Sequence, residues 1–382
     1  MKYKPVKDRR CQNEKCQDHS KFGEGNIIRH SKYKTRLGRR RRYLCKTCKK
    51  TFCSTKGTPY YRLHKSRLDF DEVVQMTVEG VGISSISRIK CFSWNTIASW
   101  QYLACQVADK FNDHKLKGVE LMELQADEIR TFVGTKKMPM WIFAAIEVWS
   151  RLWISKVVGN RNYRNIKTLL NQVIDACRIV NPFIFTTDGF EPYSWATKNL
   201  MSSICLYAQV IKKRRKNRVI KVERRLIIGT KPKIEQLLFE SEDSSTINTS
   251  FIERLNLTIR QGCAYLGRRT ACHSRHKDLL ANNLELQMCY YNFVRPHSAL
   301  KFGDETRTPA MQAGLVKKQL SFREIFMAVA ILFWWYSVFM RMLVQVERFS
   351  WFSVQQQQLM KEAPNCFTIL KEYTMFLQIA EN

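Results

Sequence analysis

Three acidic residues, Asp127, Asp188 and Glu253, have the residue type and local context of a divalent-metal site. Asp127 stands in the middle of a strand-like segment of alternating polarity, and Asp188 ends the short apolar segment NPFIFTTDG. Glu253 lies near the start of the amphipathic segment NTSFIERLNLTIRQ. Acids on two neighbouring strands and a following helix can converge at the edge of an open α/β sheet. Converging carboxylates repel one another unless a hard divalent cation lies among them, and two such cations about 4 Å apart clamp the oxygens of a phosphoryl transfer.

Each of these acids also has a purely structural interpretation. Ser250 and Glu253 form the Ser-x-x-Glu pattern of a capping box, in which the serine accepts from a helix amide and the glutamate reaches back. Asp188 precedes Gly189 and can cap a turn. Asp127 can lie on the surface of an edge strand. The metal site is therefore predicted from the conjunction of the three acids and not from any one of them.

The charge balance favours a polyanionic partner. The chain has 382 residues, of which 45% are hydrophobic, so it can bury a globular core. It carries 64 Lys and Arg against 33 Asp and Glu, a net charge of +31. Such a surface attracts nucleic acid first and an anionic membrane second. The start, MKYKPVKDRR, has no apolar run after it, so we expect a reducing compartment in which clustered cysteines bind metal.

Four cysteines near the start have the spacing of a structural zinc site. They form two pairs, Cys11-x4-Cys16 and Cys45-x2-Cys48, on two knuckles. Four thiolates arranged in this way give the tetrahedral site that zinc prefers. Cys53 is expected to be a core thiol, and His19 stays open as a substitute ligand. The same region is basic, and we expect its run of four arginines to contact DNA phosphate: Arg39, Arg40, Arg41 and Arg42.

The next segment has the pattern of a helix-turn-helix. DEVVQMTVEG and SSISRIK predict two helices, and Ser93 is the expected N-cap of a third. Trp94, Ile97, Trp100 and Leu103 are expected to form its inner face. The side chains predicted to face a major groove are those of Asn95, Thr96, Ser99 and Gln101. A plain helical hairpin would have the same pattern, so this prediction draws support from the neighbouring basic ribbon.

The rest of the chain predicts an α/β layer followed by an apolar tail. ELQADEIRTFVG, WIFAAIEVW and RLWISKVVG have strand composition, a helix follows, and NPFIFTTDG is a buried strand expected to run parallel to the first. Two long strands then surround a basic tip predicted to grip DNA, with Lys212, Lys213, Arg214 and Arg215. Residues 325–340 lack charge but are shorter than the roughly 20 residues of a spanning helix. A buried or oligomer-contacting helix is therefore favoured over a membrane span.

From Cys11 to about Phe326 the sequence resembles the DDE transposases of bacterial and archaeal insertion sequences, close to the insertion-sequence-one group. The resemblance is carried by YLCKTCKKTFCSTKGTPYYR, LQADEIRTFV, FTTDG, INTSFIERLNLTIRQ, YYNFVRPHSAL and TPAMQAGL. It implies an RNase-H-like catalytic core with Asp127, Asp188 and Glu253 as the matching acids. ADE also offers Glu128, but the family has an aspartate there, so Glu128 is taken as a flanking residue.

The resemblance completes a multidomain α/β prediction. Its parts are a zinc ribbon at 1–68, a helix-turn-helix domain at 69–117, an RNase-H-like core with a basic β-hairpin insertion at 118–314, and an apolar helical tail at 315–382. Arg260 and Asn256, on the helix of Glu253, are candidates for contact with the scissile phosphate, with Arg260 counted among the DNA-binding residues. His297 is expected to be structural.

The implied activity is that of a DNA transposase, which cuts at the inverted repeats of a mobile element and transfers the freed 3′-hydroxyl to target DNA. The expected cofactors are two Mg²⁺ or Mn²⁺ ions at the three acids and a structural Zn²⁺. The expected partners are double-stranded DNA and further copies of the chain, in the cytoplasm of a prokaryote at the nucleoid. Two other hypotheses stay open: a DNA-binding regulator without catalysis, and an RNase-H-like nuclease without strand transfer.

Overall fold

The computed structural model describes residues 5–328, apart from 8, 14, 20, 22, 37, 217 and 269–271. The chain divides into two compact units, Met1–Ala330 and Ile331–Asn382, and the second lies outside the described residues. Most of the uncharged segment 325–340 lies there too, so its helix stays a prediction. Within the described part, no helix combines the length and the apolar character needed to cross a bilayer.

The N-terminal region is a small antiparallel ribbon. It consists of β1 (Ile27–Thr35), β2 (Gly38–Cys45) and β3 (Thr51–Cys53), paired in the order β1-β2-β3. Its described core is small and consists of Val6, Ile27, Phe52 and the buried cysteines, with Tyr43 and Cys48 packed against them. Since so small an apolar core contributes little stability, a metal cross-link would add to it substantially.

Three helices follow: α1 (Arg67–Val78), α2 (Ile83–Lys90) and α3 (Trp94–Lys115). The Ser93 side chain accepts from the amide of Thr96 at the start of α3, as predicted. The predicted inner face is partly wrong, because Ile97 and Trp100 are buried whereas Trp94 is 52% and Leu103 40% exposed. The buried stripe of α3 runs along other positions, which include Gln101, Ala104 and Ala108.

The central element is a six-stranded mixed sheet. Its strands are β5 (Glu123–Phe132), β6 (Pro139–Glu147), β7 (Trp153–Gly159), β9 (Phe183–Thr187), β10 (Cys205–Arg215) and β11 (Arg218–Ile228). They lie in the order β11-β10-β9-β5-β6-β7. β6 is antiparallel to both β5 and β7. The fully buried β9 is parallel to β5, as predicted. This mixed sheet is consistent with an RNase-H-like core.

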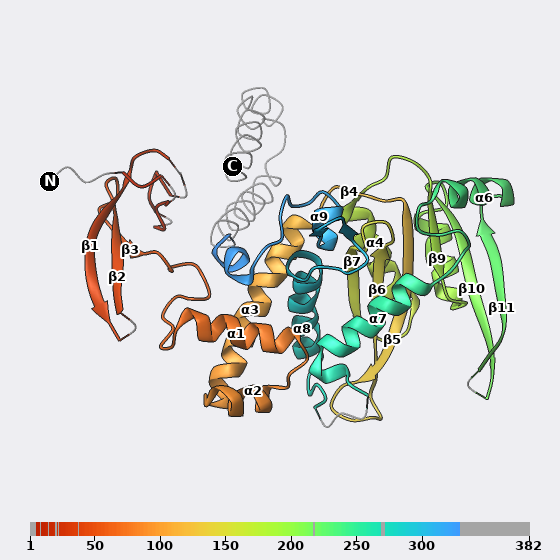
Figure 1. Ribbon diagram of the computed structural model, residues 1–382, viewed down its shortest axis with the longest axis horizontal. Helices are drawn as coiled ribbons and strands as arrows, with labels where there is room; N and C mark the ends of the chain where they lie inside the picture. The colour runs from red at the N-terminus through yellow and green to blue at the C-terminus, as the bar shows by residue number, and fades with distance from the viewer. Residues whose placement is uncertain are drawn as a thin grey trace, which may run out of the picture. The chain divides into compact units, whose positions relative to one another are not determined.

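Helices cover both faces of the sheet (Figure 1). They are α4 (Tyr163–Ala176), α5 (Glu191–Leu200), α6 (Lys231–Glu240), α7 (Ser250–Gly262) and α8 (Lys277–Cys289). α7 crosses β5 and β6, and α3 packs along α8, where Asn112 donates to the main chain of Glu285 at 3.0 Å. The predicted long hairpin is present as β10 and β11.

Short elements complete the described chain. They are β4 (Val119–Glu120), β8 (Cys177–Arg178), a 3-10 turn (Ala264–Leu266), a π-turn (Tyr290–Val294), β12 (Lys301–Phe302), β13 (Glu305–Thr306) and α9 (Pro309–Gln312). A last helical segment covers 322–328. Phe326 of this segment packs edge-on against Phe70 of α1, with ring centroids 5.7 Å apart, so the end of the described chain packs against the first helix.

Candidate metal centre and nucleic-acid interface

Strand register places Asp127 beside Asp188. In the parallel pair, Glu123 is opposite Ile184 and Gln125 is opposite Thr186. Continuing in step puts Asp127 level with Asp188, which directly follows the end of β9. The carboxylates of Asp127, Glu128 and Asp188 each have an oxygen within 4.8 Å of the other two. The two aspartates predicted to converge therefore do so.

Glu128 joins this cluster although it was predicted to be only a flanking residue. Successive side chains of a strand point to opposite faces, so Glu128 lies on the face of β5 opposite to Asp127. Its Oε1 accepts from Arg161, which follows β7 and also lies 3.8 Å from Asp188. The Glu128 side chain is only 2% exposed, and its Oε2 has no hydrogen-bond partner. A buried carboxylate oxygen without a hydrogen-bond partner is chemically suited to binding a cation.

Glu253 lines the same cleft but is engaged elsewhere. Its carboxylate pairs with Lys212 of β10 and accepts from the hydroxyl of Thr249 at 2.8 Å. It is not among the acids grouped within 4.8 Å. The cleft has a volume of about 860 Å³. It is lined by Asp127, Arg161, Asp188, Gly189, Phe190, Glu191, Pro192, Trp195, Val210, Ile211, Lys212, Thr249 and Glu253.

The electrostatics of the cluster favour a bound cation. Burial raises the pKa of Asp127 to about 6, and the charges of Asp188 and Glu253 act in the same direction. Burial also raises the pKa of Glu128 to about 7, again with help from Asp188. The metal-free fold therefore disfavours the ionised forms of both acids. Three carboxylates with one nearby guanidinium offer several hard oxygen ligands, which suit Mg²⁺ or Mn²⁺.

The start of α7 is capped from the sheet, so the predicted capping box of Ser250 and Glu253 is wrong. The buried side chain of Gln125 accepts from the amides of Phe251 and Ile252 at 3.1 and 3.2 Å. Ser250 instead donates from its amide and hydroxyl to Asn248 Oδ1. The buried side-chain oxygen of Gln125 therefore satisfies N–H groups in the first turn of α7 that would otherwise lack an acceptor, and the exposed Ser250 is not needed as a cap. Gln125 thereby ties the helix of Glu253 to the strand of Asp127.

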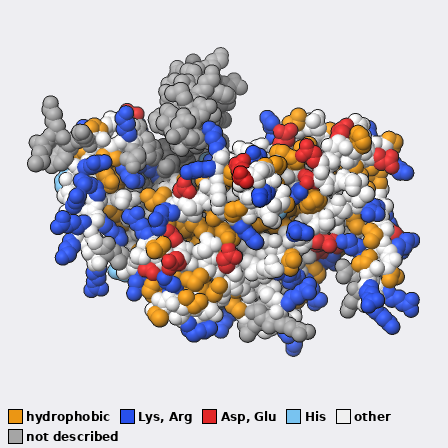
Figure 2. All heavy atoms as spheres, in the orientation of Figure 1, with side chains coloured by type: hydrophobic (Ala, Val, Ile, Leu, Met, Phe, Trp, Pro, Cys, Tyr) orange, Lys and Arg blue, Asp and Glu red, His pale blue; other side chains and the backbone are white. Residues whose placement is uncertain are grey.

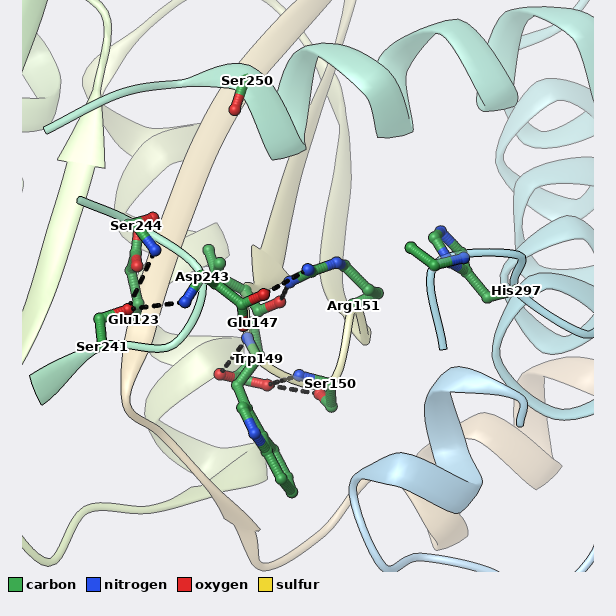
Figure 3. Close-up of polar contacts among 12 residues, drawn as sticks. Glu123, Glu147, Trp149, Ser150, Arg151, Ser241, Asp243, Ser244, Ser250 and His297 are labelled. Atoms are coloured by element: carbon green, nitrogen blue, oxygen red, sulfur yellow. Dashed lines mark hydrogen bonds and ion pairs between the residues drawn. The ribbon is translucent and has the colours of Figure 1, made fainter. Parts of the chain in front are cut away.

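The loop before α7 is anchored at several points (Figure 3). Ser244 donates to the buried Glu123 at 2.9 Å, and Arg151 donates to Asp243 at 2.5 Å. Glu147 at the end of β6 turns toward Ser150, whose amide lies 2.7 Å from its carboxylate. The contacts of Ser244 and Asp243 therefore join the loop to the start of β5 and to the turn after β6, which gives α7 a fixed entry point.

Three residues singled out in the sequence, Asn256, Arg260 and His297, are not among those that line the cleft. Asn256 of α7 donates to Asp127 Oδ2 at 2.9 Å and so orients that carboxylate. Arg260 donates to the main-chain oxygen of Arg130 at 3.4 Å. Burial, together with the charge of Arg151, lowers the pKa of His297 to about 4, so its imidazole is neutral at pH 7. The cations that line the cleft are Arg161 and Lys212, and the sequence analysis had not connected either of them with the acids.

The four predicted zinc ligands meet in the ribbon. Cys11, Cys16, Cys45 and Cys48 have sulfur atoms within 4.8 Å of one another. The Cys11–Cys48 and Cys16–Cys45 sulfur distances are 3.5 and 3.8 Å. A zinc ion with bonds of about 2.3 Å requires tetrahedral edges of about 3.8 Å. The cluster therefore fits a structural zinc, and neither Cys53 nor His19 belongs to it.

The predicted DNA-binding residues have different surroundings. Arg39 to Arg42 lie along β2, exposed or half-buried, and the Arg42 guanidinium stacks over Tyr33 at 4.9 Å. Asn95 and Ser99 are exposed on α3 and Thr96 is half-buried, but Gln101 is buried and donates to Thr77, so its predicted base contact is wrong. On the β10–β11 hairpin, Lys213 and Arg215 are exposed. Lys213 pairs with Glu223 at 2.8 Å.

Lysine and arginine side chains gather over the ribbon and at the tip of the β10–β11 hairpin (Figure 2). α3 carries no basic residue before Lys110. The exposed start of α3 therefore offers uncharged polar and aromatic groups, whereas the ribbon and the hairpin offer positive charge.

Comparison with solved structures shows a distant likeness in fold. No family model matches the sequence, and no curated protein matches it. Among solved structures, the chain is similar to a piggyBac transposase in a synaptic complex with hairpin DNA, determined by cryo-EM. The two are 11% identical, the match covers 79% of this chain and 77% of that chain, and the TM-score is 0.33. Because this TM-score is low, the match carries no functional argument. The strand order and the side-chain geometry of the cleft carry it instead.

Proposed function

We propose that this chain is a DNA transposase of the DDE type, which hydrolyses a phosphodiester bond at the end of a mobile element and transfers the freed end to target DNA. The observation that carries the proposal is the shared cleft of Asp127, Asp188 and Glu253 in a chain of net charge +31. An acidic cleft alone repels DNA, so its presence in such a basic protein is best explained by metal-dependent phosphoryl transfer.

The three acids would hold Mg²⁺ or Mn²⁺, as two ions in the assembled site. Bound there, the ions would neutralise charge on the phosphate and lower the pKa of the attacking hydroxyl. Asn256 fixes one oxygen of Asp127 through its hydrogen bond of 2.9 Å. Arg161 is held by stacking on Phe190 and Trp141, at 3.7 and 4.8 Å, and its guanidinium, which pairs with Glu128 and Asp188, would bind a phosphate oxygen that enters the cleft.

DNA binding is assigned to the basic β-structure. The zinc ribbon at 1–68 would bind the element ends through Arg39 to Arg42, and the hairpin tip would bind the flanking backbone through Lys213, Arg214 and Arg215. The helical domain at 69–117 would contribute Asn95, Thr96 and Ser99. The core at 118–314 would act within a homodimer or higher oligomer, because two element ends must be joined to one target.

Cleavage of DNA from the flanks of the coding sequence tests the proposal. The variants Asp127→Asn, Asp188→Asn and Glu253→Gln are each expected to lose Mg²⁺-dependent cleavage by at least about 10²-fold, since each removes a charge from the site. Glu235→Gln is the matched control, because Glu235 lies exposed on α6.

Three outcomes separate this activity from its alternatives. Cleavage that survives all three substitutions would refute the assignment of the site. Binding of flanking DNA without cleavage under any metal condition would indicate a regulator. Cleavage without products joined to a target plasmid would indicate a nuclease of the same fold.

A further inference from the structure

We propose that Glu128 is a ligand of the divalent cation in the DNA-free protein, and that Glu253 enters the site only when DNA draws Lys212 away from it. This inference rests on the proposed function of the cleft and adds a fourth carboxylate to it. It also gives the site an order of assembly, in which the cation binds Asp127, Glu128 and Asp188 first.

The first argument is the position of Glu128. Its carboxylate lies within the 4.8 Å group that contains both aspartates, whereas Glu253 does not. Its side chain is 2% exposed, and that of Glu253 is 47% exposed. One Glu128 oxygen is satisfied by Arg161, and the other has no hydrogen-bond partner. A buried carboxylate oxygen without a partner is costly, and a cation between the three acids would remove that cost.

The second argument is what holds Glu253. The Lys212 ammonium and the Thr249 hydroxyl both bind the same carboxylate oxygen of Glu253. α7 itself is fixed by Gln125 and cannot easily follow the side chain. Movement of Glu253 into the cluster is therefore limited by its pairing with Lys212.

The third argument is the location of Lys212. It lies on β10, opposite Val222 of β11, and lines the cleft. A DNA phosphate that reaches the cleft would compete with Glu253 for the ammonium. Breaking that pair would free Glu253 for the cation, so DNA and the metal would each strengthen the binding of the other, as thermodynamic linkage requires.

Mn²⁺ binding without DNA tests the inference. The electron paramagnetic resonance signal of free Mn²⁺ is measured in titrations of the full chain and its variants. Glu128→Gln is expected to weaken binding by about tenfold or more, as even the loss of a supporting group often does. Glu253→Gln is expected to match the exposed control Glu235→Gln. Lys212→Ala is expected to strengthen DNA-free binding, and this gain is expected to disappear in the double variant with Glu253→Gln.

The outcomes separate this inference from the proposed function. Equal losses in Glu128→Gln and Glu253→Gln, or no loss in Glu128→Gln, would overturn it. Should Glu128→Gln fail to fold, an unchanged affinity in Lys212→Ala would overturn it independently. Mn²⁺ binding that appears only when DNA is added would refute the order of assembly and leave the transposase proposal standing. No binding in either condition would refute both.

Discussion

Neutralising Glu128 is expected to stabilise the metal-free protein. Its pKa rises from 4.5 to about 7 in the fold, chiefly through burial. At about 1.4 kcal/mol per pKa unit, keeping this carboxylate ionised costs on the order of 3 kcal/mol. The variant Glu128→Gln keeps the shape and removes the charge, so at pH 8 its free energy of unfolding should exceed that of the wild type by up to this amount.

The pH dependence gives the sign of the effect. A carboxyl whose pKa is raised in the fold contributes stability below its unfolded pKa and loses that contribution as the pH rises through about 7. The difference between Glu128→Gln and the wild type should therefore be small at pH 5 and large at pH 8. In chelated samples it corresponds to a rise in melting temperature of roughly 4–5 °C at pH 8.

Thermal melts with and without Mn²⁺ complete the assay. The wild type should gain stability from Mn²⁺ through ligand binding, and Glu128→Gln should gain much less. The difference in melting temperature between the two proteins should therefore shrink or change sign. Glu235→Gln should behave as the wild type throughout. A variant that is less stable than the wild type at pH 8 in chelator would refute the reasoning, because it would mean that the pair with Arg161 outweighs burial and carboxylate repulsion.

Three further predictions address the helix cap, the ribbon and the hairpin. Gln125→Leu should lower the free energy of unfolding in urea by about 2 kcal/mol or more, because two amides at the start of α7 lose their acceptor. Ser250→Ala should be nearly neutral. A larger loss of stability in Ser250→Ala than in Gln125→Leu would support the capping box instead. Cys48→Ser should release zinc, measured by a chelating dye, and make the ribbon sensitive to protease, whereas Cys53→Ser should keep the metal. Arg215→Ala should reduce the salt dependence of DNA binding by about one counterion, and an unchanged slope would place the hairpin away from DNA.

Much of the fold follows from local sequence signals. The aliphatic runs of β5, β6 and β7 and the apolar β9 predicted strands, and all were confirmed. The parallel pairing of β9 with β5 was also predicted, and it is this register that brings Asp127 and Asp188 together. The cysteine pairs were equally informative, because ligand spacing on two turns is a local property.

The parts that sequence reasoning missed depend on contacts between distant segments. Glu128 joins the acids only because its side chain is long and Asp188 lies at the end of the neighbouring strand. Gln125 caps α7 from 126 and 127 residues away, which no local capping pattern can indicate. Similarly, the periodicity of α3 did not distinguish Gln101, which binds Thr77, from the exposed polar residues beside it. Packing partners decided each case.

The double anchoring of α7 has a consequence for how this protein can vary. Between β9 and α7 the chain forms α5, the β10–β11 hairpin and α6. Yet the start of α7 is fixed to β5 by Gln125, and the loop before it is fixed by Glu123 and Arg151. The length and composition of the hairpin tip can therefore change without displacing Glu253. New preferences for DNA could be acquired there by exchanging one surface module, while the chemistry beneath it stays the same.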